Sequence, residues 1–234
     1  MAVSVGSQGI HTNVSGSWFS ATTPKTATIS WSTGDVIVVG GAMENAGQAF
    51  STPTATGLTF TSRQSTTLTG FGNSKAQLWT AKAAASGSSV VLSLATASGT
   101  AMFGMYYWVL SGADDYVSGG LLSGTTNPTF AGATDGFVGW ICSDWAAATV
   151  NPAPLAGTGT PTELVDTDNA GANYGIYVDQ WLGTTNASTT YGITPYTSMQ
   201  AQGCAIAVSA SAGGGATPSL IVPSRRSIRS LIVR

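Results

Sequence analysis

The sequence predicts an all-β protein of the sandwich or barrel type, on three observations. Short runs of alternating or continuously apolar residues recur along the chain. Stretches rich in Gly, Ser, Asn and Asp, which tolerate turn dihedrals, separate these runs. Long helical periodicity is absent before residue 213. Strands and turns at this regular spacing are typical of β-sandwiches and β-barrels.

Individual strands are readable from their apolar period. The stretch TATISW (Thr26–Trp31) alternates and puts Ala27, Ile29 and Trp31 on one face. The stretch GDVIVVGG (Gly34–Gly41) opens with a turn and continues as a short apolar run, which is typical of a buried strand.

The strand pattern also repeats at an offset of about one hundred residues. Three segments of the first half have later counterparts in the same order: Ser32–Gly41 and Gly132–Cys142, Ser74–Leu94 and Asn173–Thr194, Gly104–Ala113 and Gly203–Ala212. We therefore expect a sandwich over residues 14–212, with halves 14–113 and 114–212, whose two sheets bury each other's apolar sides. A short N-terminal segment, 1–13, precedes it. A Gly-rich linker, 213–219, and an arm, 220–234, follow it.

Charge is scarce and unevenly placed. Charged residues make up 8% of the 234 residues, while aromatic residues make up 9%, so the composition is not that of a disordered chain. All ten acidic residues lie between Asp35 and Asp179, so residues 1–224 carry a net charge of −6 and the last ten carry +4. An acidic body argues against nucleic acid as the main partner, because phosphates require a basic surface.

We expect synthesis in the cytoplasm without export by the usual route. The N-terminus lacks a basic stretch followed by an apolar one, and the longest apolar run, Ala101–Leu110, has half the length of a membrane helix. In that compartment Cys142 and Cys204, which both lie in strand-like segments, are expected to be reduced core residues; a disulfide is the alternative.

No catalytic residue, cofactor or metal is predicted. His11 is the only histidine and lies in a polar stretch, so we expect it at the surface. The segment Asp166–Gly171 begins like a calcium loop, but positions five and twelve are Ala170 and Tyr177, which favours a polar turn. Asp114-Asp115 also reads as a turn. A glycosidase-type carboxylate pair stays open as an alternative, since the sequence gives no distances.

The tryptophans fall into two groups. Five lie in strand patterns and are expected in the core: Trp31, Trp79, Trp108, Trp140 and Trp181. Trp18 and Trp145 lie nearer loops and are candidates for stacking against a ligand.

The last seventeen residues, PSLIVPSRRSIRSLIVR, combine arginines with aliphatic side chains. So many exposed aliphatic residues would promote association, and arginine pairs well with carboxylates, so we expect an interaction arm rather than a free tail. Ser224 could begin a short helix, and extended pairing through Leu-Ile-Val is the equal alternative. The expected partner-binding residues are Leu220, Ile221, Val222, Arg225, Arg226, Ile228, Arg229, Leu231, Ile232 and Arg234.

The stretches GDVIVVGG, GLTFTSR, AQLWTAKAAASGSSVVLSL and YYWVLSGA, followed by a degenerate second copy, resemble a jelly-roll type common in tailed-phage virion proteins and bacterial surface proteins. The resemblance covers Trp31–Ala212 and rests on strand and turn patterns. It implies a jelly-roll β-sandwich that builds or decorates a surface, and it brings no active site. The basic arm is not part of the shared pattern.

This resemblance leads to a functional hypothesis. We expect a non-enzymatic structural protein at the virion surface, most directly a capsid decoration or minor capsid protein attached through its arm. Its partners would be the major capsid protein or other virion subunits, and copies of itself in a homo-oligomer, with a trimer as one option. Neither nucleic acid nor membrane is expected as a partner. The alternatives are a minor tail or tail-fibre protein and a carbohydrate-binding receptor module.

Overall fold

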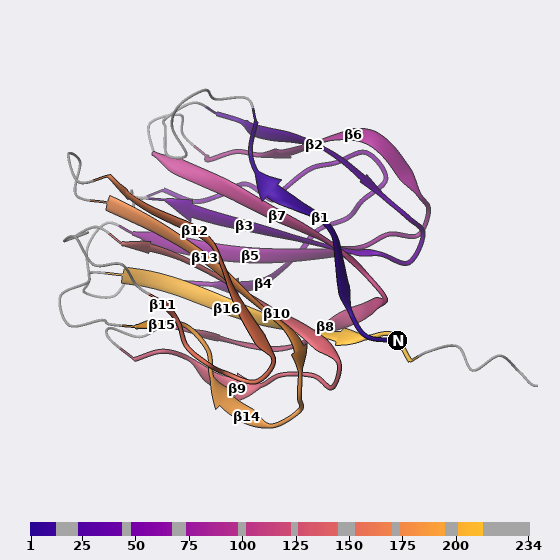
Figure 1. Cartoon of the computed structure of the whole chain (residues 1–234). Helices are drawn as coiled ribbons and strands as arrows, with labels where there is room; N and C mark the ends of the chain where they lie inside the picture. Colours follow the sequence, from indigo (N-terminus) through magenta and orange to yellow (C-terminus); the bar gives the residue numbers. More distant parts are fainter. Residues whose placement is uncertain are drawn as a thin grey trace, which may run out of the picture.

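The computed structural model describes residues 1–12, 23–43, 48–66, 74–97, 102–122, 126–144, 153–169, 174–194 and 201–212. Within these residues the protein is all-β, as the sequence predicts. Four layers of strands lie on top of one another (Figure 1).

The two central layers are five-stranded antiparallel sheets. In spatial order, the first sheet contains β1 (Ser4–Ile10), β7 (Phe103–Ser111), β3 (Val36–Met43), β5 (Lys75–Lys82) and β4 (Thr61–Ser65). The second contains β8 (Ala113–Leu121), β16 (Ala201–Ala210), β10 (Gly136–Asp144), β13 (Tyr174–Thr184) and β12 (Thr160–Asn169).

Three two-stranded sheets cover the outer faces of these central layers. The first sheet is covered by β2 (Lys25–Trp31) paired with β6 (Gly87–Leu94). The second is covered by β9 (Thr129–Ala131) with β14 (Ser188–Thr190), and by β11 (Ala153–Pro154) with β15 (Ile193–Thr194).

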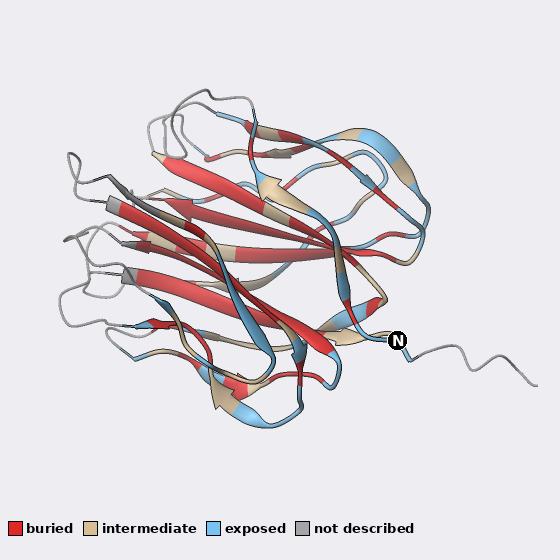
Figure 2. Cartoon of the chain, in the orientation of Figure 1, coloured by how far each residue is buried: buried red, intermediate tan, exposed pale blue. Residues whose placement is uncertain are grey.

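The central core is shared by both halves of the chain, so the prediction of one sandwich made from two halves is confirmed. Val38, Leu78 and Trp108 from the first sheet pack with Ile141 and Ile206 from the second, and each of these side chains is 0% exposed. The outer layers were not predicted. They explain why β3 is buried at every position, since its alternate side chains enter two different cores (Figure 2).

The two central sheets have the same strand order. The strands β1, β7, β3, β5 and β4 correspond in sequence order to β8, β16, β10, β13 and β12. The registers also correspond, because residues that pair across the first sheet have counterparts that pair across the second. Each outermost pairing has a register shift at the same place, around Arg63 between β4 and β5 and around Leu164 between β12 and β13. In each half, the five-stranded sheet and the two-stranded pairs that cover it follow a jelly-roll strand order.

The sandwich begins before residue 14, contrary to our expectation. The strand β1 pairs with β7 over Ser4–Ile10. Its sequence, SVGSQGI, has no apolar alternation, so only its partner strand defines it. His11 follows it and is 2% exposed, so the prediction of a surface histidine is wrong. The Met105 amide donates a hydrogen bond to His11 Nδ1 at 3.4 Å.

The two halves join at Gly112, between β7 and β8. Its φ is +70°, and a Cβ there would lie 2.8 Å from the Ala2 carbonyl oxygen, so a glycine is required. The Ser211 amide donates to the Gly112 carbonyl at 2.7 Å, and the Met1 amino group donates to the Ser211 carbonyl at 3.4 Å. The N-terminus and the last described residues therefore lie side by side (Figure 1).

The tryptophans and cysteines that we expected in the core are buried there. All five strand tryptophans are buried, with exposures between 0% and 6%. Neither Cys142 nor Cys204 forms a disulfide, and both are buried, as expected of core cysteines. They lie on neighbouring strands but on opposite faces of the second sheet, Cys204 in the central core and Cys142 in the outer one, so they cannot pair.

Candidate functional site

The residues expected to bind a partner or a ligand lie outside the described part of the chain. These are Trp18, Trp145 and every position of the arm. The described body nevertheless has features to which the sequence analysis assigned no role.

The first of these is an unequal distribution of charge between the halves. The second half, residues 113–212, contains no Lys or Arg and all of these acidic residues: Asp114, Asp115, Asp135, Asp144, Glu163, Asp166, Asp168 and Asp179. The first half contains the four basic residues of the body, Lys25, Arg63, Lys75 and Lys82. The second half therefore has a formal net charge of −8.

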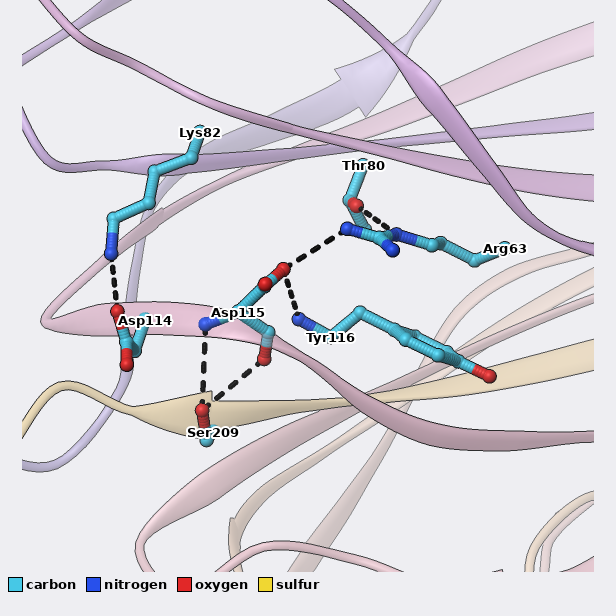
Figure 3. A network of polar contacts seen from close by, with 7 residues as sticks. All are labelled: Arg63, Thr80, Lys82, Asp114, Asp115, Tyr116 and Ser209. Carbon is cyan, nitrogen blue, oxygen red and sulfur yellow. Dashed lines mark hydrogen bonds and ion pairs between the residues drawn. The ribbon is translucent and has the colours of Figure 1, made fainter.

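Two ion pairs connect the halves where β8 passes β4 and β5 (Figure 3). Arg63 Nη2 lies 3.0 Å from Asp115 Oδ1, and Lys82 pairs with Asp114. Both acids belong to strand β8, so the prediction of a turn at Asp114-Asp115 is wrong; the turn is at Gly112. The pairs are exposed, so each contributes at most about 1 kcal/mol to stability.

Further contacts orient this junction. Arg63 Nε donates to Thr80 Oγ1 at 2.7 Å, and its guanidinium lies 5.0 Å from the centre of the Tyr116 ring. Asp115 Oδ1 also accepts the Tyr116 amide at 2.7 Å (Figure 3). Arg63 is thus held in place by three partners, which fixes the two sheets relative to each other at this edge.

The second feature is a buried carboxyl group near the opposite edge of the second sheet. Asp179 on β13 is 1% exposed and faces the outer layer of that sheet. Its register partners are Glu163 on β12 and Trp140 on β10. Among the described residues, Asp179 Oδ2 and Trp140 Nε1 are buried without a hydrogen-bond partner. Such groups are rare in folded proteins and call for an explanation.

Burial, together with the negative charges of Glu163 and Asp166, raises the pKa of Asp179 to about 8. The carboxyl is therefore largely protonated at neutral pH.

Comparison with the first half shows how unusual this position is. In the matching ladder row of the first sheet, Trp79 takes the place of Asp179, between Ser62 on β4 and Val39 on β3. Trp79 is 1% exposed and packs edge-on against Phe50, with ring centroids 5.7 Å apart. An apolar side chain thus suits this position, and the second half has an acid there instead.

The sequence did carry a signal for Asp179. In GIYVDQWLG the alternating residues Tyr177, Asp179 and Trp181 share a face, and the two aromatic residues mark that face as buried. The acid Asp166, by contrast, was expected in a polar turn. It lies within strand β12, so that expectation is wrong. Within the described ranges, no three His, Cys, Asp or Glu side chains are placed to hold a metal ion.

A groove of about 730 Å³ lies on the other half, between β1 and β2. Its lining combines the core residues Ile29 and Trp31 with hydroxyl side chains, among them Ser7, Ser30 and Ser111. The Trp31 indole N–H is already bound to the Ala85 carbonyl at 2.9 Å. This volume is within the range of small-molecule sites, although such sites are usually more apolar.

The chain matches no protein-family model, no curated protein and no solved structure. Among the described residues, no helix has the length and apolar composition needed to span a membrane.

Proposed function

We propose that this protein is a non-enzymatic structural component of a tailed-phage virion, most directly one that decorates the capsid. The folded body presents its surface to solvent, and the arm attaches it to neighbouring virion subunits. A position on the tail is the close alternative within the same proposal.

One observation gives this proposal its main support. The second half has a counterpart for each strand of the first half's central sheet, and β16, the counterpart of β7, ends at Ala210. Within the described residues, the strand repeat of that sheet is complete without the arm. The arm carries four arginines and seven aliphatic residues. Segments of this composition suit docking into another surface.

The test is whether the arm is needed for incorporation but not for folding. A chain lacking residues 218–234 should keep its all-β circular dichroism and its melting temperature, because the described body makes the sandwich without them. It should be absent from particles purified on a density gradient. The number of copies per particle, counted by quantitative mass spectrometry, provides the answer.

The groove between β1 and β2 favours a second candidate, a carbohydrate-binding module. Its hydroxyl side chains and the buried carboxylate of Asp35 could bond a neutral saccharide, and no Lys or Arg lines it. This function predicts saturable binding of neutral oligosaccharides that Ser30→Trp abolishes and that deletion of the arm leaves unchanged. If a panel of neutral glycans shows no binding by isothermal calorimetry, or if the arm deletion removes it, this candidate fails.

A further inference from the structure

The strand β12 differs in charge from the other outermost strands of the two central sheets. It contains Glu163, Asp166 and Asp168, whereas β1 has no charged residue and β4 has only Arg63. The acids of β8 are already paired with Lys82 and Arg63. Among the described strands, β12 is hydrogen-bonded to β13 alone.

A second observation at the same place is the carboxyl of Asp179. It lies directly opposite Glu163, one strand further into the sheet, and its Oδ2 has no hydrogen-bond partner among the described residues. The charge of Glu163 acts on it unfavourably. A cation beside Glu163 would offset the negative charge that helps to raise the pKa of Asp179, so the arrangement fits a positively charged partner lying along β12.

The arm has the matching chemistry. It carries a charge of +4 against a half that contains eight acids and no base. Leu220–Val222 is an apolar, β-branched segment that favours extended pairing, and Arg225 and Arg226 follow at a distance that one strand spans. An unpaired strand edge accepts an extended segment through main-chain hydrogen bonds, and arginine binds carboxylates with two parallel bonds.

We propose that β12 is the docking surface for the C-terminal arm of a second copy of this chain. Residues 220–229 add to the outer edge of β12 as an antiparallel strand, and the arginines pair with Glu163. This inference rests on the proposed function of the arm as an anchor, and it names the partner.

The ladder registers favour a second copy over the arm's own body. Val208, Phe137, Leu182 and Thr160 form one row across the second sheet, so the chain leaves β16 at the end where β12 begins. The linker 213–219 could cross the roughly 14 Å between these strands. The arm would then follow β12 in the parallel direction, which pairs less favourably than the antiparallel one. An arm from another copy is free to approach antiparallel.

This contact joins one surface of a copy to a different surface of the next. Repeated contacts of this kind produce rings or open arrays, which is the behaviour required of a protein that covers a particle.

The experiment uses mixtures of two variants of the chain, each with one added cysteine. One carries Thr162→Cys, an exposed position of β12, and the other carries Ser224→Cys in the arm. Because Cys142 and Cys204 are 0% exposed, they do not compete in a folded chain. After mild oxidation, we expect a disulfide-linked heterodimer on a non-reducing gel. Thr61→Cys, an exposed position on the edge strand β4, replaces Thr162→Cys as the matched control and should give several-fold less product.

Charge variants test the electrostatic part of the contact. Adding Glu163→Gln to the Thr162→Cys chain should lower the yield several-fold, whereas Asp135→Asn, which also removes one exposed acid of the second half, should not. Raising the salt from about 0.1 M to about 1 M should also lower the yield, since the screening length falls from about 10 Å to about 3 Å.

A Thr162→Cys yield equal to that of Thr61→Cys would overturn the proposal. A variant that carries both added cysteines would also overturn it if its disulfide formed only within one chain while the mixture gave no heterodimer. If deletion of the arm abolishes incorporation while the mixture gives no heterodimer, this inference fails and the anchoring function stands. If incorporation survives the deletion, the anchoring function fails.

Discussion

Trp108→Ala should lower the free energy of unfolding by about 3–5 kcal/mol, the largest single effect that we expect in the body. Trp108 is 0% exposed and lies on β7 between the two central sheets. Its ring packs against Phe137 of the other half, with centroids 5.8 Å apart. Its indole N–H donates to Gln180 Oε1 at 3.1 Å, and removing the donor leaves that oxygen buried and unbonded.

Urea denaturation followed by circular dichroism measures this loss. Trp108→Phe is the matched variant, because it keeps an aromatic ring and removes the donor with the smaller part of the indole, so its cost should be smaller, about 1–3 kcal/mol. Both variants should unfold in a single transition, since the core belongs to both halves. A loss below about 1 kcal/mol for Trp108→Ala, or two separate transitions in the wild type, would contradict a shared core.

The second large effect concerns pH. The pKa of Asp179 is about 8 in the folded protein, and an unfolded aspartate has a pKa of about 3.9. The folded state therefore holds its proton more tightly than the unfolded state. It follows that the contribution of Asp179 to stability is fully present below about pH 4, falls as the pH rises towards 8, and levels off above that value.

The fall amounts to about 1.4 kcal/mol for each pH unit, or roughly 3–4 kcal/mol between pH 5 and pH 8. Asp179→Asn removes the ionisation and keeps the shape, so its stability should stay nearly constant over this window and exceed that of the wild type at pH 8. The exposed Asp135→Asn serves as the control and should follow the wild type. If the free energies of unfolding of wild type and Asp179→Asn change in parallel with pH, the pKa of Asp179 in the folded protein is not raised as we describe.

Much of the fold was predictable because the spacing of apolar residues within a single strand shows which of its faces are buried. The residues Ala27, Ile29 and Trp31 are buried on one face of β2, as their alternation predicts. The run after Asp35 forms the central strand β3, because a continuous apolar run suits a strand covered on both sides. The strand repeat was visible for the same reason, since corresponding strands bury similar faces.

Other features depend on contacts between distant segments and were missed. The strand β1 is polar and exists through its pairing with β7, about one hundred residues away. His11 was placed at the surface because its neighbours in sequence are polar, yet it lies beside Met105. Asp114 and Asp115 resembled a turn, because paired acids suit turns. Here they lie in β8, which pairs with β16, and they contact Lys82 and Arg63 of the other half.

The candidate surface was only partly readable. The sequence positions place the four body cations in one half and most of the acids in the other, but only the structure shows which of them pair between the halves. The position of Asp179 opposite Glu163 depends on the register of β12 with β13, which a bulge at Leu164 changes. Register is set by tertiary packing, and no local pattern encodes it.

The central claim is that the arm anchors the folded body in a virion, and the number of copies per particle tests it most directly. Replacing Arg225, Arg226 and Arg229 by glutamate reverses the charge of the arm while leaving every described residue in place. Replacing the same three by lysine keeps the charge and serves as the control. We expect the glutamate variant to fall to background in purified particles by quantitative mass spectrometry, and the lysine variant to retain a substantial share of the wild-type number. Particles that hold the glutamate variant at the wild-type number would contradict the claim.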